Sequence, residues 1–180
     1  MPGADAVCTG LADPMTIAKR VVAGCAFLAA CTRGGVAATL NPHDRAIVGE
    51  WLICIECIDP LDSLRVVASR QPASTIDALS SALADGLPRA RIAKLRGAID
   101  ASYARDSGYR ARVGEPALPA RATYVEQRVA KYDNGYRSRG ASGLGYVNLP
   151  AAKARLAAVD TLPLPPSVRA AVRYARDSLP

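Results

Sequence analysis

Apolar residues recur at helical spacing along most of the chain from residue 41 onward, with Pro and Gly between the periodic stretches. Asn41 is a good N-cap, Pro42 suits the first helical position, and the residue before Pro60 disfavours helical backbone. These signals predict a first helix over residues 42–58. Its expected buried stripe, at i, i+4, i+7 and i+11, consists of Ile47, Trp51, Cys54 and Ile58, widened by Ile53 and Ile55.

The same period predicts further helices, separated by proline and glycine. A second helix is expected over residues 61–70. A third is capped by Ser74 or Thr75 and closes at Gly86, where a left-handed residue is expected. Residues 106–120 have little apolar period and contain two Gly and two Pro, so a loop is predicted there. The remaining helices are expected over residues 89–105, 121–147, 150–160 and 166–178.

Glycines recur in the second half of the helix predicted over residues 121–147. Each glycine in a helix interior costs about 1 kcal/mol relative to alanine, so their repetition needs a packing reason. A glycine without a side chain allows another backbone to approach closely. We therefore expect a tight helix crossing in this segment, which contains Gly135, Gly140, Gly143 and Gly145.

The N-terminal part has the pattern of an export signal. Lys19 and Arg20 form a short cationic region, and residues 21–30 are uncharged. A run of this length fits the apolar region of a secretory signal, whereas a membrane-spanning helix needs about 20 apolar residues. Residues 1–14 lack any such pattern, so Met15 is the expected start of the signal.

Residues 28–31, Leu-Ala-Ala-Cys, resemble the lipobox of bacterial lipoproteins, in which a small residue precedes a lipid-bearing cysteine. The resemblance implies that Cys31 receives the lipid and becomes the mature N-terminus. It places the protein in the periplasm or cell envelope as a membrane-anchored lipoprotein. Thr32 replaces the Asp that holds enterobacterial members at the inner membrane. Two alternatives remain, which are cleavage near residues 36–38 and a buried N-terminal helix that is never removed.

With such a signal the chain divides into three parts. Residues 1–30 form the N-terminal extension and signal, residues 31–40 a Gly- and Ala-rich tether, and residues 41–180 a single helical domain. A domain of about this size buries roughly two-thirds of the surface that its unfolded chain exposes. The chain is therefore long enough for one domain with a real core.

Export would leave Cys54 and Cys57 as the only cysteines besides Cys31. An oxidising compartment favours a disulfide between them, because positions i and i+3 of a helix lie within bridging distance. The alternative is a reactive thiol pair, but the C-terminal end of a helix does not stabilise a thiolate. No metal or other cofactor is expected, since a closed zinc site needs four ligands and His43 is the only histidine.

Residues 139–152, with the sequence RGASGLGYVNLPAA, resemble the unit of HEAT and HEAT-like repeats. In those proteins an Arg opens an Ala-rich helix that ends in Leu-Gly, and a polar-Pro turn leads to an antiparallel helix. Asn148 stands where Asp is usual, and Gly140 and Gly143 where Ala is usual. Residues 168–172, VRAAV, resemble the start of a next unit. The resemblance implies an all-α fold, a HEAT-like α-solenoid of antiparallel helix pairs that binds partners.

The net charge is +7, from 23 Lys and Arg against 16 Asp and Glu. This balance suits an anionic partner, although no block of consecutive basic residues is present. The last predicted helix carries a basic stripe at i, i+4 and i+7, which is either a solvated face or a contact for lipid headgroups, acidic polymers or phosphate. That stripe consists of Arg169, Arg173 and Arg176.

These patterns favour an exported, lipid-anchored, non-catalytic interaction or assembly module of the cell envelope. Its expected contacts are a protein partner and the membrane through Cys31, and nucleic acid is not expected. One alternative is a thiol–disulfide oxidoreductase that uses Cys54 and Cys57. A second is a cytoplasmic nucleic-acid-binding helical-repeat protein, which requires that residues 1–30 are not a signal.

Overall fold

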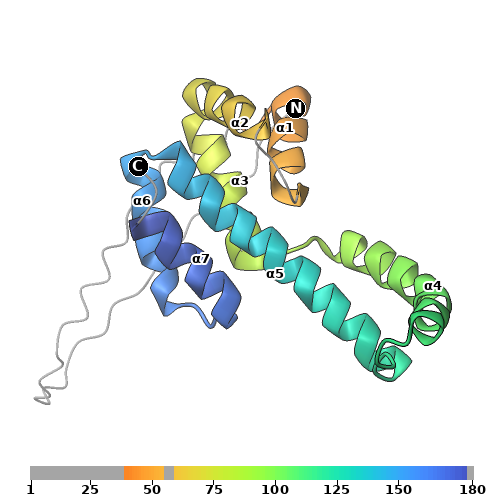
Figure 1. Cartoon of the computed structure of the whole chain (residues 1–180). Coiled ribbons are helices and arrows are strands. Elements are labelled where there is room, and N and C mark those ends of the chain that lie inside the picture. Colours follow the sequence, from red (N-terminus) through yellow and green to blue (C-terminus); the bar gives the residue numbers. More distant parts are fainter. Residues whose placement is uncertain (1–38, 55–58, 178–180) are drawn as a thin grey trace, which may run out of the picture. The chain divides into compact units, whose positions relative to one another are not determined.

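The computed structural model describes residues 39–54 and 59–177, all within one compact unit of residues 36–180. Within these residues the protein is all-helical, as expected, and no strand is present. The expected signal, Cys31 and most of the tether lie outside the described residues. The helices are α1 (Pro42–Ile53), α2 (Asp59–Arg70), α3 (Pro72–Asp85), α4 (Arg89–Val113), α5 (Arg121–Val147), α6 (Pro150–Ala158), the 3-10 helix η1 (Val159–Thr161) and α7 (Pro166–Asp177) (Figure 1).

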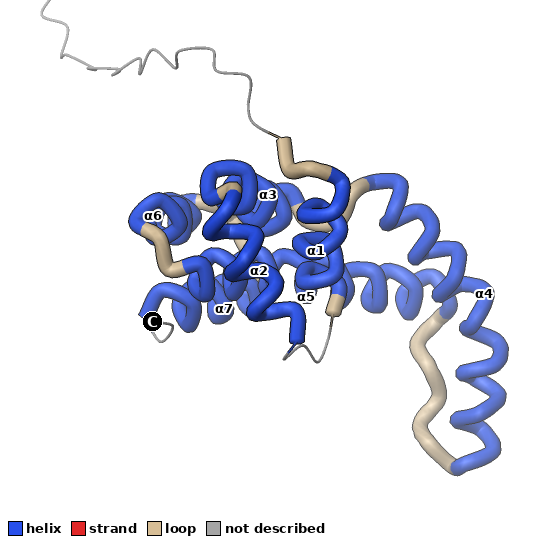
Figure 2. The backbone as a smooth tube through the Cα atoms, turned by 90° about the horizontal axis from the view of Figure 1, so that it is seen from above, coloured by secondary structure: helices blue, strands red, loops and turns tan. Residues whose placement is uncertain are grey.

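Helix α5 is the element on which the others pack. It contacts α3 and α7 most extensively, and it also contacts α1, α2, α4 and α6. Its 27 residues span about 40 Å at 1.5 Å per residue. The helix is therefore long enough to pack against α4 along one part and against the other helices along the rest. Helix α4 runs out and α5 returns beside it, so the two form a helical hairpin (Figures 1 and 2).

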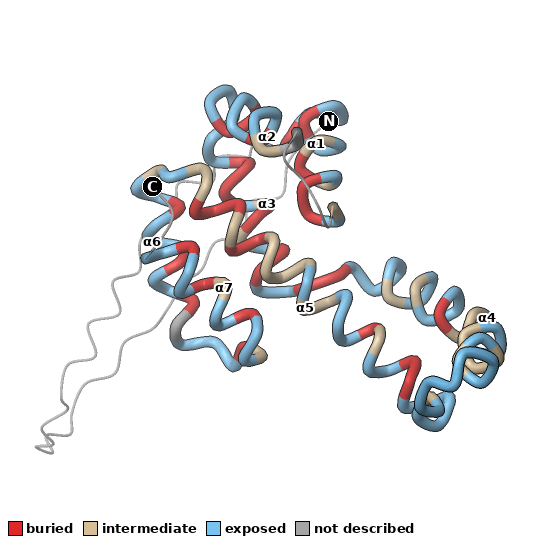
Figure 3. Tube along the Cα trace, in the orientation of Figure 1, coloured by how far each residue is buried: buried red, intermediate tan, exposed pale blue. Residues whose placement is uncertain are grey.

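Two separate apolar clusters form the core between these helices. The larger one joins the second half of α5 to α1, α2, α3, α6 and α7. The smaller one lies between α4 and the first half of α5, and Ile99 is the only buried residue of α4 (Figure 3). The fully buried large side chains of the first cluster include Trp51, Leu64, Leu79, Leu83, Leu144 and Leu156.

The predicted tight crossing is present at Gly140 and Gly143. A Cβ atom added to Gly140 would lie 2.8 Å from both the carbonyl oxygen of Leu79 and the amide nitrogen of Leu83, which belong to α3. A Cβ added to Gly143 would lie 2.8 Å from the indole nitrogen of Trp51. The glycines therefore let α3 and α1 approach the backbone of α5, whereas an added Cβ at Gly135 meets no atom within 4 Å.

The first helix is shorter than predicted. It ends at Ile53, and Cys54 has extended backbone with ψ of 136°. The carbonyl oxygen of Cys54 accepts hydrogen bonds from the guanidinium of Arg139, so this group is held by α5 instead of by a further helical turn. The prediction for Ile53 is also wrong, because 47% of that residue is exposed. Ile55, Cys57 and Ile58 lie outside the described residues.

Helix α4 is longer than predicted, and the loop is correspondingly shorter. The helix continues from the expected end near residue 105 to Val113, and Gly114 ends it in a left-handed conformation with φ of 72°. The added turns are supported by the hydroxyl of Ser102, which donates to Asp106, and by the packing of Tyr103 against Tyr124. Contacts within α4 and with α5 thus compensate for the weak apolar period of this stretch.

The start of α3 also differs from the prediction. Gln71 is the N-cap residue and Pro72 occupies the first turn, so Ser74 and Thr75 lie inside the helix. Both are buried, and the hydroxyl of Thr75 donates to the carbonyl oxygen of Gln71 at 2.8 Å. Pro72 starts the helix because its missing N–H has no partner to lose in a first turn. Gly86 closes α3 with the predicted positive φ, 75°, but its ψ of -153° differs from that of a left-handed helical residue.

Candidate functional site

A groove of about 630 Å³ lies against the middle of α5. One side is formed by the end of α1, and the other by Leu87 and the first turns of α4. We call it the basic groove, because four of its lining side chains are cationic and none of the described ones is acidic. Its residues are Leu52, Ile53, Cys54, Leu87, Arg91, Leu95, Arg128, Lys131, Tyr132, Gly135, Tyr136, Ser138 and Arg139.

The apolar side chains of the groove come from all three helices and from the turn before α4. Leu52 and Leu87 are buried, while 47% of Ile53 and 42% of Tyr132 remain exposed. Tyr136 is half-buried, and its burial raises the pKa of its hydroxyl. The groove therefore offers apolar contact area that no other described part of the chain covers.

The wall at Leu87 is held by side chains of α5. The carboxylate of Asp133 accepts a hydrogen bond from the amide of Leu87 at 2.7 Å and one from Nε of Arg137 at 2.8 Å. Arg137 in turn donates to the carbonyl oxygens of Leu83 and Asp85, the unsatisfied acceptors at the end of α3. The pair therefore fixes the α3–α4 turn relative to the groove.

The wall at Cys54 is held by Arg139. Its guanidinium donates two hydrogen bonds to the carbonyl oxygen of Cys54, at 2.9 and 2.7 Å. It also stacks over the indole of Trp51, with 4.7 Å between its central carbon and the ring centroid. Arg139 is therefore a structural cation, although it contributes positive potential to the groove.

The other three cations of the groove have no carboxylate partner among the described residues. Arg128 lies 5.8 Å from the ring centroids of both Tyr124 and Tyr132, and its Nε is buried with no hydrogen-bond partner in the part of the chain that the structure describes. Arg91 and Lys131 are exposed. These side chains leave cationic donors available to a ligand in the groove.

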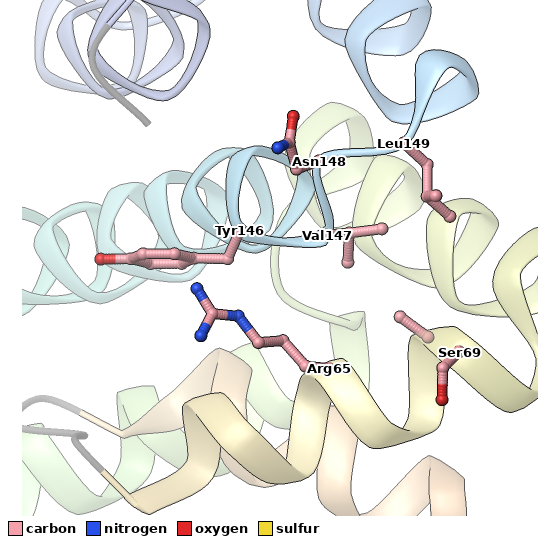
Figure 4. Close-up of a pocket in the computed structure, with 7 residues that line it drawn as sticks. Arg65, Ser69, Tyr146, Val147, Asn148 and Leu149 are labelled. Carbon is pink, nitrogen blue, oxygen red and sulfur yellow. The ribbon is translucent and has the colours of Figure 1, made fainter. Parts of the chain in front are cut away.

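A second, smaller hollow of about 330 Å³ lies between α2 and the end of α5 (Figure 4). Its only charged lining residue among those described is Arg65, which faces Tyr146 in Figure 4. Asn148, which also lines this hollow, has the left-handed backbone that ends α5, with φ of 50°. This hollow has half the volume of the basic groove and fewer groups that could bind a ligand.

The predicted basic stripe lies on an exposed face of α7 that flanks its buried face, because each arginine directly follows a buried residue. Arg176 pairs with Asp177 at 2.8 Å, and this pairing lowers the pKa of the Asp177 carboxyl. Arg169 is directed toward the end of the preceding loop, where it donates to the carbonyl oxygen of Leu164 at 3.4 Å. The stripe of Arg169, Arg173 and Arg176 therefore exists as a surface, and its contact with a partner stays a prediction.

The predicted cysteine site is described only in part. Cys54 follows the last residue of α1, and its amide donates to the carbonyl oxygen of Glu50 at 3.0 Å. Because its backbone is extended, Cys54 itself does not continue the helix that the prediction assumed. Cys57 lies outside the described residues, so the disulfide stays a prediction. His43 is exposed in the first turn of α1.

The segregation of charge was missed by whole-chain reasoning. Residues 89–147, which form α4 and α5, carry twelve Lys and Arg against five Asp and Glu. Their net charge of +7 equals the formal net charge of the whole chain, so the remainder is balanced. Counting charge by predicted helix would have found this. The sequence alone could not show that both helices belong to one hairpin.

No family model, curated protein or solved structure was found to match this chain. Among the described residues, no helix is long and apolar enough to cross a membrane, and no group of His, Cys, Asp and Glu side chains could hold a metal ion. Function is therefore inferred from the groove, the charge of the α4–α5 hairpin and the N-terminal pattern.

Proposed function

We propose that this protein is an exported, lipid-anchored and non-catalytic interaction module of the cell envelope, which binds an acidic protein partner through the α4–α5 hairpin. The observation that carries the proposal is the net charge of +7 on residues 89–147. An excess of one sign steers a partner of opposite charge and raises its association rate. The anchor is proposed at Cys31.

The surface of α4 supports this role. Only one of its 25 residues is buried, although the helix is one of the two longest described. Several of its cations are exposed without a carboxylate within 4 Å among the described residues, so a partner would not have to displace an internal ion pair. Besides Arg91 of the groove, these are Arg89, Lys94 and Arg112.

The finer fold, a HEAT-like solenoid of antiparallel helix pairs, belongs to the same proposal. Helices α5 and α6 pack together across the two-residue turn of Asn148 and Leu149, which supports the proposed repeat unit. In a solenoid each repeat contacts its neighbours. Helix α5 instead contacts six other helices, so any repeat in this chain is irregular.

The anchor is tested by the intact mass of the protein from the membrane fraction of cells that express the full chain. The expected mass corresponds to a chain beginning at Cys31 with added acyl groups. Cys31→Ser is expected to lose the acyl mass and to leave the membrane fraction. A chain that retains residues 1–30 unmodified would overturn the proposed anchor.

The binding surface is tested by photo-crosslinking from p-benzoylphenylalanine placed at Ala98, an exposed position of α4. One acidic envelope protein is expected to crosslink, with a yield that falls as salt concentration rises. Placement at Ala157, an exposed position of α6, is the control and should give no such product.

Charge variants distinguish partner binding at the α4–α5 hairpin from partner binding at the basic stripe of α7. Replacing Arg89, Lys94 and Arg112 by Gln is expected to abolish the crosslink. Replacing Lys153, Arg169 and Arg173 by Gln removes the same charge from other exposed positions and should leave it intact. Loss of the crosslink only in the second variant would transfer the partner site to α7 and overturn the hairpin assignment.

The charge on the hairpin also favours the second candidate, a cytoplasmic nucleic-acid-binding protein. Six of the seven tyrosines lie among the cations of residues 89–147, and aromatic rings between cations can stack on bases. Retention of residues 1–30 together with salt-dependent binding of single-stranded oligonucleotides would favour this candidate. An acylated N-terminus at Cys31 would exclude it.

The thiol–disulfide alternative has less support. Cys54 lies at the C-terminal end of α1, where the helix dipole does not favour a thiolate. Slow reaction of Cys54 and Cys57 with a thiol reagent after mild reduction, becoming fast on unfolding, is expected for a structural pair. Fast reaction in the folded protein at neutral pH would favour the oxidoreductase.

A further inference from the structure

The geometry of the basic groove points to a ligand: we propose that it binds a single-chain anionic amphiphile, with the acyl chain against the apolar side chains and the anionic head on Arg91, Arg128 and Lys131. This inference goes beyond the proposed partner surface. It concerns side chains that line the groove and does not depend on Cys31 or on the partner.

The size of the groove favours a small amphiphile over a peptide helix. Small-molecule sites occupy roughly 300–1,000 Å³, and the volume of about 630 Å³ falls in this range. A helix of three turns, about 16 Å long and 10 Å across, has about twice that volume. The groove can hold one flexible chain without a change in α1, α4 or α5.

The apolar part of the groove is a continuous lining and not a single exposed side chain. Leu52 and Ile53 come from α1, Leu95 from α4, and Tyr132 and Tyr136 from α5. Burial of one additional methylene group on such a surface strengthens binding by about fourfold. Affinity should therefore rise with chain length until the groove is filled.

Charge complementarity fixes the sign of the head group. The described lining contains four cations and no carboxylate. Arg139 is already committed to the carbonyl oxygen of Cys54. Arg91, Arg128 and Lys131 have no such partner among the described residues. A carboxylate or a phosphate head would accept hydrogen bonds from these groups.

Gly135 allows the groove to be filled without disturbing the fold. It lines the groove in the interior of α5, and an added Cβ there meets no atom of the described residues within 4 Å. Gly135→Leu should therefore place a side chain in the groove and preserve the helix. Gly97→Leu is a matched control, because Gly97 also lies inside a helix, has no atom within 4 Å of an added Cβ, and does not line the groove.

The test is calorimetric titration of the full chain with four probes below their micelle-forming concentrations: dodecanoate, dodecyl phosphate, dodecanol and dodecyltrimethylammonium. Dodecanoate and dodecyl phosphate are expected to bind with 1:1 stoichiometry, and the tighter of the two identifies the head group. The neutral and cationic probes should bind at least about tenfold more weakly. Decanoate should bind about 15-fold more weakly than dodecanoate, since it lacks two methylene groups.

Two variants locate the site. Gly135→Leu should abolish binding of dodecanoate while Gly97→Leu preserves it, with both variants folded by circular dichroism. The double variant Arg91→Gln/Lys131→Gln should bind dodecanoate about tenfold or more weakly but bind dodecanol as the parent does. Equal affinity for all four probes, or unchanged binding by Gly135→Leu, would overturn the proposal. Binding of an acidic amphipathic peptide but of no single-chain probe would also overturn it, by assigning the groove to a protein segment.

Discussion

Trp51 and Arg139 contact each other in two ways, through a hydrogen bond and through a cation–π contact. The indole Nε1 of Trp51 donates to the main-chain oxygen of Arg139 at 3.0 Å, and the guanidinium of Arg139 lies 4.7 Å above the same indole ring. That guanidinium also binds the carbonyl oxygen of Cys54. The end of α1 is thereby attached to α5 at the edge of the basic groove.

Replacement of Arg139 by Lys tests whether the two guanidinium donors to the carbonyl oxygen of Cys54 stabilise the fold. The substitution keeps the charge, but a lysine ammonium cannot reproduce the planar pair of donors on Cys54. Arg139→Lys should lower the free energy of unfolding by about 1–2 kcal/mol, measured by urea denaturation. Arg155→Lys is the control, because the Arg155 pair with Asp77 is exposed and a change within about 0.5 kcal/mol is expected. Equal effects of the two substitutions would contradict a structural role for Arg139.

The crossing at Gly140 predicts opposite effects of alanine at two glycines of α5. Gly140→Ala should destabilise the fold by roughly 1–3 kcal/mol, because its Cβ would press on the backbone of α3. Gly135→Ala should stabilise it by about 0.5–1 kcal/mol through helix propensity, since no atom lies near its added Cβ. Thermal unfolding of both variants measures the difference. A stabilised Gly140→Ala protein would show that α3 and α5 are not in close contact.

Asp44 connects α1 to the junction of α2 and α3. Its buried carboxylate accepts hydrogen bonds from Arg70 and Gln71 at 2.6 Å and from Asn41 at 2.8 Å. Asp44→Ala should cost about 1–3 kcal/mol, because these donors lose a buried acceptor although Arg70 can still reach water. Urea denaturation measures the loss, and Asp62→Ala, at an exposed carboxylate, is the control. A change no larger than that of the control would contradict the proposed connection.

The tip of the α4–α5 hairpin should depend on acidic pH through Asp106. The hydroxyls of Ser102 and Tyr124 donate to its carboxylate, and these hydrogen bonds lower the pKa of Asp106. A carboxyl with a lowered native pKa contributes stability that is full above its unfolded value of about 3.9 and is lost as pH falls through the native value. Amide exchange near residues 102–124 should therefore accelerate as pH falls below about 4, after correction for intrinsic rates.

Asp106→Asn provides the comparison for this pH effect. The variant should exchange faster than the parent at pH 6 and approach it at low pH, where the parent carboxyl is protonated. Its own corrected exchange rates should change less with pH than those of the parent. An unchanged pH dependence in Asp106→Asn would assign the effect to other carboxylates.

Local pattern alone determined the helical class and most helix positions. The period-3.6 stripe of the first helix predicted a buried Trp51, and this side chain is fully buried. The glycines of α5 predicted a close crossing, because their cost in a helix requires a compensating contact. These features depend on residues that are near one another in sequence or on one helix face, so periodicity was sufficient to find them.

Tertiary structure decided where helices end and which side chains meet. Helix α1 stops at Ile53 although its apolar period continues, because Arg139, 85 residues away from Cys54, takes the carbonyl that a longer helix would use. Helix α4 passes its expected end near residue 105, where Tyr124 of α5 packs against Tyr103 and donates a hydrogen bond to Asp106. The basic groove likewise requires α1, α4 and α5 together. Periodicity reports one face of one helix and carries no information about which distant face packs on it, so these contacts appear only when the chain is folded.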